Sequence, residues 1–397
     1  MKKFFPCFIA ACLIALFSVL PGSVSADFLS AEFSVSSFTD QTGMAYPEKE
    51  YTAELSRLEG LTARAEELFS PEREGSDVYR INHAAGGEKI TVDEWTMRLI
   101  LVAKTAYEKT GGAFDPALYP LVKLWGFSAD HEGNYSTPRK EPEAAEISRL
   151  LQYADFSLLK TDEKTLTVEK PYEAMQLDFG GIVKGFILDE WAKDLPQGAN
   201  ALATVSLSST AVIGKKYADG LFRDYQIGIN DPRSSANLAL VLSASDSFLS
   251  TSGDYERYYL YNGKRYCHVL DRKTGKPTEI NVMSATAVCG IGALSDAFST
   301  ALMTLPLKES KALCEREGVQ AVLIAANGEY YLFGGASVKK STADGSVCNY
   351  KEGTELPEKI VAASNVPVWK YVLYGVIGAV GILVVFMILR GDGRRKK

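Results

Sequence analysis

The feature that most constrains how this 397-residue chain folds is an apolar run near its C-terminus. From Val366 to Leu389 the one charged residue is Lys370, close to the start of the run. As a helix, the run is long enough to cross the roughly 30 Å of a bilayer's hydrocarbon core. Aromatic residues stand at its beginning and basic residues follow it: Trp369, Tyr371 and Tyr374, then Arg390, Arg394, Arg395, Lys396 and Lys397. We therefore expect a linker at 363–367, a single transmembrane helix at 368–389 and a basic cytoplasmic tail at 390–397.

The N-terminus has the pattern of a secretory signal. Lys2 and Lys3 precede an apolar run from Phe4 to Leu20, and the small residues of PGSVSA end at Ala26. We expect a signal peptide at 1–26, with an uncleaved anchor helix as the alternative. Residues 27–362 would then form an extracytoplasmic domain held at the cell membrane by a single span.

Charge and cysteine spacing exclude several classes of protein. The whole chain carries a net charge of −6, and without the two lysines of 1–26 and the net five positive charges of 370–397 the remainder carries −13. Such an acidic domain is a poor candidate for binding nucleic acid. The cysteines after the signal form no CxxC pair, which argues against a zinc or redox motif and leaves one or two disulfides open: Cys267, Cys289, Cys314 and Cys348.

Hydrophobic periodicity between the two apolar ends predicts an α+β fold with mixed helices and antiparallel-rich sheets. Helices are expected at 49–68, 92–110, 143–151, 182–194 and 295–316. Alternation predicts a hairpin at 156–170 and strands within 201–215, 224–231, 238–253, 257–271 and 282–290. The aromatic stretch 112–127 contains Pro116 and Pro120, which exclude a regular helix across it.

The stretch LDFGGIVKGFILDEW, from Leu177 to Trp191, reads as a strand end, a glycine turn and a helix start. Adjacent glycines let the backbone approach a ligand, and the helix N-terminus behind them suits phosphate. The spacing is not GxGxxG, and the GK[ST] ending of a phosphate loop is missing. A phosphate site and a simple tight turn are therefore both open.

Two further segments contain candidate chemical groups. In LSDAFSTALMTL, Ser295 is placed as an N-cap, and Asp296 and Thr300 lie four residues apart on one helix face, as two oxygen ligands for Mg²⁺ would. The alternative is that Asp296 only interacts with the helix dipole. His268 in CHVLDRKTGKP is either a general base or phosphate contact, or a hydrogen-bonded strand residue.

The order of five motifs resembles that of the FAD:protein FMN transferase family, also called the ApbE family. The motifs are GAFDPALYPLVKLWGF, LDFGGIVKGFILD, STSGDYERYY, HVLDRKTGKP and SDAFSTALMTL, and the resemblance covers roughly residues 50–335. It implies an ApbE-like domain that splits the pyrophosphate of FAD, releases AMP and attaches FMN through a phosphoester to a Ser or Thr of an acceptor protein.

The resemblance also implies roles for individual residues. It implies contacts to FAD by Ala113, Phe114, Asp115, Asp178, Lys184 and Leu270, to which we add Arg257 of STSGDYERYY. It implies a metal site formed by the backbone carbonyl of Gly181 with Asp296 and Thr300. The catalytic set is then His268, Asp296 and Lys184, with His268 as the candidate base.

The chain departs from the family pattern at three places. Glu72 in FSPEREG replaces an aromatic residue over the adenine, and Ser208-Ser209 replaces a Gly-Gly pair, which restricts backbone approach to the cofactor. The Met-Gly-Thr start is not recognisable in SSFTDQTGMAYP.

The resemblance leads us to expect a membrane-anchored, Mg²⁺-dependent flavin transferase. Its partners would be extracytoplasmic electron-transfer flavoproteins, with no nucleic acid. The alternatives are a FAD pyrophosphatase, which forms FMN and AMP, and a noncatalytic flavin-binding membrane protein.

Overall fold

The computed structural model describes residues 33–128, 139–206, 208–340 and 350–362. The expected signal peptide at 1–26 and the expected linker, transmembrane helix and tail at 363–397 lie outside these ranges, as does Cys348. No helix within the four ranges has the length and apolar character needed to span a membrane.

The chain folds around an eight-stranded sheet with the spatial order β1, β5, β6, β11, β16, β17, β18, β20. These strands are β1 (Phe33–Thr39), β5 (Asn200–Val205), β6 (Ser209–Ile213), β11 (Ser247–Gly253), β16 (Val282–Cys289), β17 (Gln320–Ala325), β18 (Glu329–Phe333) and β20 (Lys351–Glu352). Neighbouring strands are antiparallel except β18 and β20. β16 is buried at every residue except its last, so it lies at the centre of the sheet's packing.

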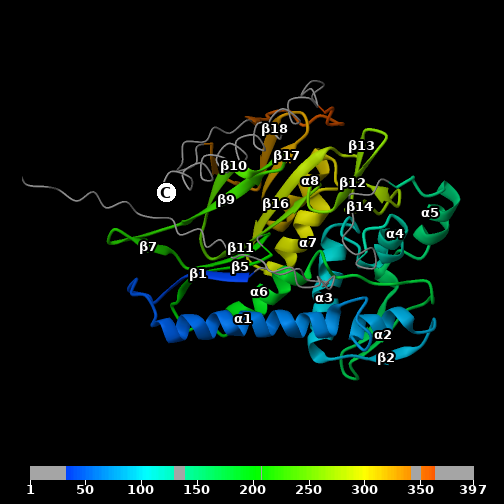
Figure 1. The fold of residues 1–397 in the computed structure, drawn as a ribbon, viewed down its shortest axis with the longest axis horizontal. Coiled ribbons are helices and arrows are strands. Elements are labelled where there is room, and N and C mark those ends of the chain that lie inside the picture. The colour runs from blue at the N-terminus through cyan, green and yellow to red at the C-terminus, as the bar shows by residue number, and fades with distance from the viewer. Residues whose placement is uncertain (1–32, 129–138, 207, 341–349, 363–397) are drawn as a thin grey trace, which may run out of the picture.

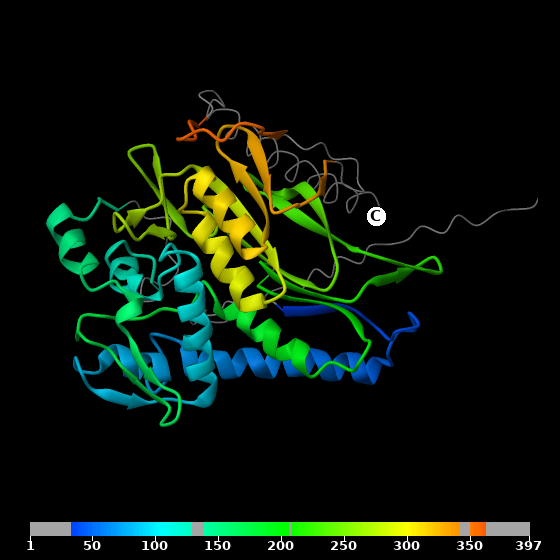
Figure 2. The same ribbon diagram turned by 180° about the vertical axis from the view of Figure 1, so that it is seen from behind.

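Helices cover one face of this sheet and a smaller sheet covers the other (Figures 1 and 2). The helices are α1 (Glu48–Phe69), α6 (Val183–Lys193), α7 (Gly292–Leu302) and α8 (Leu307–Glu317). The smaller sheet has the order β19 (Val338–Lys339), β10 (Ser234–Ala244), β9 (Tyr225–Asp231). Two hydrophobic cores result from this layering, one under the helices and one between the two sheets, and a third, smaller cluster includes Trp125, Phe127 and Tyr259.

The remaining elements lie beside the helical layer. They are α2 (Asp77–His83), α3 (Glu94–Lys109), η1 (Pro116–Leu118), α4 (Tyr119–Leu124), α5 (Ala144–Leu151) and η3 (Phe156–Leu158), with the strands β2 (Lys89–Thr91), β3 (Lys160–Asp162) and β4 (Thr167–Glu169). Short hairpins complete the fold: β7 (Lys216–Ala218) with β8 (Leu221–Arg223), β12 (Tyr258–Tyr261) with β13 (Lys264–Cys267), and β14 (Leu270–Asp271) with β15 (Lys276–Pro277).

The structure confirms the α+β class and most of the expected elements, but it corrects one helix. The segment 295–316 is not one helix, because the chain breaks at Pro306 between α7 and α8. As expected, no regular helix crosses 112–127. The segment contains two short helices, and each proline occupies a first-turn position where no intrahelical N–H is needed. Cys267, Cys289 and Cys314 are free thiols in the described part of the chain.

Candidate functional site

The glycine turn Asp178–Gly181 packs directly against α7. The Gly180 N–H donates to Asp178 Oδ1 at 2.8 Å, which closes the turn. A Cβ atom at Gly181 would lie 3.1 Å from Thr300 Oγ1 and 3.4 Å from the ring of Phe114. Glycine therefore lets the backbone of the turn meet the hydroxyl of Thr300 at close range.

The segment that leads into this turn is anchored by two buried side chains. Asn82 of α2 forms a two-way clamp on Leu177, accepting from its N–H at 2.7 Å and donating to its carbonyl at 2.9 Å. Lys170, 1% exposed, donates to the carbonyls of Asn82, Glu173 and Met175 at 2.7, 2.9 and 3.0 Å. Burial lowers the pKa of Lys170 to about 8, so at neutral pH it keeps its charge and its three donors.

Helices α6 and α7 cross at a pair of glycines. A Cβ at Gly185 would lie 1.9 Å from the carbonyl oxygen of Gly292, and a Cβ at Gly292 would lie 2.4 Å from that of Gly185. The two helices can approach this closely because neither residue has a side chain.

The N-terminus of α7 is capped by a residue of α6. Asp189 accepts from the N–H groups of Gly292 and Ala293 at 2.7 and 2.8 Å. The prediction that Ser295 is the N-cap is therefore wrong. Ser295 lies within the helix, fully buried, and its hydroxyl lies 2.8 Å from the carbonyl of Ala287.

The close crossing brings Lys184 to Asp296. Their Nζ and Oδ1 atoms are 3.5 Å apart, and Asp296 Oδ2 lies 3.3 Å from the N–H of Gly185. Lys184 also donates to the carbonyl of Gly180 at 3.1 Å. Asp296 is 2% exposed, which contradicts a role limited to the helix dipole at a surface turn. Its carboxylate connects the two helices inside the protein.

A chain of hydroxyl groups continues from Thr300 to β11. Ser252 Oγ lies 2.8 Å from Ser299 Oγ and 3.3 Å from Thr300 Oγ1. Ser252 was not among the residues expected to form the site. The hydroxyl-rich segment STSG indicated its chemistry, but only the neighbouring position of β11 and α7 puts it beside Thr300.

His268 lies between β13 and β14, with its side chain 14% exposed. Burial, together with the positive charges of Arg257 and Lys184, holds the pKa of His268 well below its ordinary value. The imidazole is therefore neutral at physiological pH and able to accept a proton. Its Nδ1 atom lies 3.3 Å from the carbonyl oxygen of Arg257, and its Nε2 atom lies 4.0 Å from Oε2 of Glu256.

Asp115 is buried in an ion pair rather than directed freely toward a ligand. Its Oδ2 accepts from Arg272 Nε at 2.8 Å, and its Oδ1 accepts from the N–H of Ala117 at 2.8 Å. Burial raises the pKa of Asp115 to about 6. Arg272 also pairs with Asp155 at 3.2 Å. These contacts hold the Ala113–Pro116 loop in place.

One cavity lies where several of these segments meet. Its volume is about 130 Å³, and it is lined by Ala113, Phe114, Asp115, Pro116, Leu118, Tyr119, Val122, Asp178, Gly180, Gly181, Lys184, Thr251, Ser252, Glu256, Arg257, His268, Val269, Leu270 and Thr300. Among the expected site residues, only Asp296 does not line the cavity. Its Oδ1 atom lies 3.5 Å from Nζ of Lys184, which does line it. Glu72, Ser208 and Ser209 are not among the lining residues, and Ser209 is fully buried, where it accepts from Ser250 Oγ at 3.0 Å.

The potential metal ligands near the Gly180–Gly181 turn are of the type that Mg²⁺ prefers. They are a carboxylate, hydroxyls and backbone carbonyls, all hard oxygen ligands. Across the described ranges there is no group of three or more His, Cys, Asp or Glu side chains that could hold a metal on their own. The site therefore fits a cation that takes part of its ligand shell from phosphate or water.

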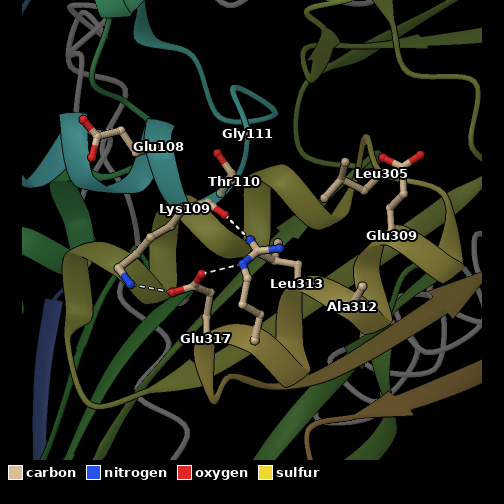
Figure 3. Close-up of a pocket in the computed structure, with 10 residues that line it drawn as sticks. Glu108, Lys109, Thr110, Gly111, Leu305, Glu309, Ala312, Leu313 and Glu317 are labelled. Atoms are coloured by element: carbon tan, nitrogen blue, oxygen red, sulfur yellow. Dashed lines mark hydrogen bonds and ion pairs between the residues drawn. The ribbon is translucent and has the colours of Figure 1, made fainter.

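A larger cavity, about 530 Å³, lies between the end of α3 and α8 (Figure 3). Lys109 and Arg316 both pair with Glu317, and Arg316 also donates to the carbonyl of Lys109. Each of these three charged groups thus has a partner within the protein. The chemistry of the molecule is therefore assigned to the smaller cavity.

Comparisons with known proteins identify the family to which the chain belongs. The model of the ApbE family matches residues 17–324. A FAD:protein FMN transferase of Klebsiella pneumoniae (strain 342) is 33% identical over 282 residues, which are 70% of this chain and 84% of that protein. The FAD:protein FMN transferase of Treponema pallidum (strain Nichols) is 32% identical over 291 residues, with 70% and 78% covered.

Two solved structures share the fold. The ApbE protein from Thermotoga maritima aligns with a TM-score of 0.63 at 27% identity, over 74% of this chain and 91% of that one. The apo form of the Pseudomonas stutzeri flavinyl transferase ApbE aligns with a TM-score of 0.62 at 26% identity, over 79% and 95%.

Proposed function

Because the chain belongs to the ApbE family and is a FAD:protein FMN transferase, we propose that it uses Mg²⁺ to cleave FAD, attaches FMN through a phosphoester to a Ser or Thr of an acceptor protein, and releases AMP. The observation that supports this most is the meeting of Lys184, Asp296 and Thr300 at the Gly180–Gly181 turn, beside a neutral His268.

Asp296, Thr300 and the carbonyl of Gly181 would hold the cation. When bound, Mg²⁺ supplies Lewis-acid stabilisation of the pyrophosphate. Lys184 contributes a positive charge beside the turn, where it offsets the negative charge that develops on phosphate oxygens. Ser252 orients the hydroxyl of Thr300 through its hydrogen bond.

His268 is the group that receives the proton of the acceptor hydroxyl. Its low proton affinity keeps it unprotonated and ready, and the 14% exposure of its side chain limits access by water. Apolar side chains also line the cavity, where flat rings of a dinucleotide would pack: Phe114, Leu118, Val269 and Leu270. Arg257 lines the same cavity and offers a cation to phosphate.

We further propose that this reaction takes place outside the cytoplasmic membrane on electron-transfer flavoproteins. The support is the sequence pattern of 1–26 and of 368–397, which predicts export and a single membrane anchor. The acceptors would then be extracytoplasmic proteins that lie near the bilayer.

The deciding experiment mixes the full chain, in detergent, with FAD and a candidate acceptor domain, with Mg²⁺ or with EDTA. AMP is followed by chromatography, and covalent flavin on the acceptor by in-gel fluorescence and intact mass. We expect AMP and labelled acceptor only when Mg²⁺ is present. AMP and free FMN without labelling would instead identify a FAD pyrophosphatase, and bound FAD without AMP a noncatalytic flavin-binding protein.

Matched variants locate the activity. Thr300→Val keeps the shape of the side chain but removes the hydroxyl, so it should lower Mg²⁺-dependent transfer. Glu309→Gln changes a charge in the larger cavity between α3 and α8 and should leave transfer unchanged. Equal losses in both variants would mean that the smaller cavity is not the site.

A further inference from the structure

The tautomer of His268 is determined by the carbonyl of Arg257. The backbone N–H of His268 donates to this oxygen at 3.0 Å, and Nδ1 lies 3.3 Å from the same atom. Because a carbonyl oxygen only accepts hydrogen bonds, Nδ1 carries the hydrogen and Nε2 keeps its lone pair. The basic atom of the ring is therefore Nε2.

Glu256 faces that basic atom. Its Oε2 lies 4.0 Å from His268 Nε2, which is too long for a direct hydrogen bond. A single oxygen atom placed between the two groups can form a hydrogen bond to each of them. Glu256 immediately precedes Arg257 in the chain. One short segment thus supplies both the carbonyl that orients the ring and the carboxylate opposite its lone pair.

The two side chains differ in their access to solvent. The side chain of Glu256 is 38% exposed and that of His268 is 14% exposed, and both line the cavity. Glu256 is therefore the member of the pair that is more accessible to solvent.

The surroundings shift the pKa values of the two groups in opposite directions. Burial, Arg257 and Lys184 lower the pKa of His268. The protein atoms packed around the carboxyl group raise the pKa of Glu256, and Asp296 adds to this effect, whereas Lys184 and Arg257 oppose it.

We infer that Glu256 is the proton partner of His268, a role that rests on the proposed transfer reaction. In that reaction the O–H bond of the acceptor breaks and its oxygen forms a bond to the phosphorus of FMN. The phosphorus–oxygen bond to AMP breaks, and AMP keeps the electron pair. His268 Nε2 takes the proton, Glu256 stabilises the imidazolium, and the proton then passes through Glu256 to solvent.

Glu256 acts through His268 and not on the reacting atoms, so it is a positioning residue. A merely structural role predicts no change in the titration of the imidazole when Glu256 is replaced. The proton-partner role predicts that this titration changes even in protein that is not turning over.

The first test is a titration of the full chain with ¹³C-labelled histidine rings. The chain has three histidines, His83, His131 and His268, and the variant His268→Asn identifies the third signal. We expect Glu256→Gln to lower the midpoint of His268 by at least about half a pH unit, because a facing charge at this separation is lost. Glu279→Gln is the control, since Glu279 is 66% exposed and pairs with Lys264. An unchanged midpoint in Glu256→Gln would overturn the inference.

The second test is kinetic. We expect Glu256→Gln to slow AMP release about tenfold with unchanged FAD affinity, and to cause no further loss in a His268→Asn background. An equal loss in both backgrounds would show that Glu256 acts independently of His268 and would overturn the inference. If the wild-type chain neither releases AMP nor labels an acceptor, the proposed function fails, while the titration still decides whether the pair exists.

Discussion

Replacing Gly185 by Ala tests whether the crossing of α6 and α7 organises the site. The added Cβ would lie 1.9 Å from the carbonyl oxygen of Gly292, whereas real Cβ contacts stay beyond 3.0 Å. The obstacle is backbone, so α6 and α7 must separate by about 1.1 Å, the difference between these two distances. Overpacking of this kind costs about 1–3 kcal/mol, and the better helix propensity of Ala returns less than about 1 kcal/mol. We expect a net loss of about 2 kcal/mol in the free energy of unfolding.

The control is the same substitution at Gly60, in the exposed part of α1. A Cβ at Gly60 meets no described atom within 4 Å, so Gly60→Ala should stabilise the protein by about 0.5–1 kcal/mol. Urea unfolding of both variants followed by fluorescence gives the two changes, with the slope of the transition showing that unfolding stays comparable.

Gly185→Ala should also impair the chemistry. In the wild-type protein Lys184 Nζ lies 3.5 Å from Asp296 Oδ1, and separation of the helices increases this distance. A misplacement of about 1 Å in a catalytic group lowers the rate about a hundredfold. Gly60→Ala should keep the wild-type rate of AMP release. Wild-type stability and rate in Gly185→Ala would refute the close helix crossing as the basis of the site.

Three further predictions follow from the described contacts. Asp296→Asn should reduce Mg²⁺-dependent AMP release at least about a hundredfold while circular dichroism stays unchanged; full activity would remove Asp296 from the site. Lys170→Met should lower the free energy of unfolding by about 3 kcal/mol, because three buried carbonyls lose their donor; an unchanged urea midpoint would contradict this. Burial raises the pKa of Asp115 from 3.8 to about 6, so between these pH values the folded state binds more protons than the unfolded state. The contribution of Asp115 to stability is therefore complete below about pH 4 and is lost as the pH rises through about 6. The free energy of unfolding of Asp115→Asn relative to wild type should therefore rise by about 2–3 kcal/mol from pH 4 to pH 7, and parallel pH profiles would be the contrary result.

Most of the secondary structure could be predicted from local pattern. The helix predicted at 182–194 is α6 (Val183–Lys193), because its apolar spacing and the preceding glycine turn are both local signals. The predictions fail where a single residue changes the outcome. Pro306 divides the last helical segment, and the α7 cap comes from Asp189, about a hundred positions away in the chain, rather than from Ser295.

The residues of the candidate site were selected from the sequence, but their contacts were not predicted. His268, Lys184 and Thr300 were selected for the chemistry of their side chains and for their resemblance to a family, and the fold places all three around one cavity. No pattern in the neighbouring sequence indicated that Asp115 pairs with Arg272 or that Glu256 faces His268. Both depend on loops that approach each other only in the folded chain.

The sequence by itself determined which groups are available to this protein, namely the acidic domain between two apolar ends, the glycine turn, the hydroxyls and carboxylates of five motifs, and the family to which they belong. Only the tertiary structure decided how these groups act on one another. Close packing of Gly185 on Gly292 brings Lys184 to Asp296, and burial among positive charges keeps His268 neutral. Both effects depend on distances between segments that are remote in the chain and on the burial of side chains by those segments. Neither the distances nor the burial can be read from a linear pattern of residues.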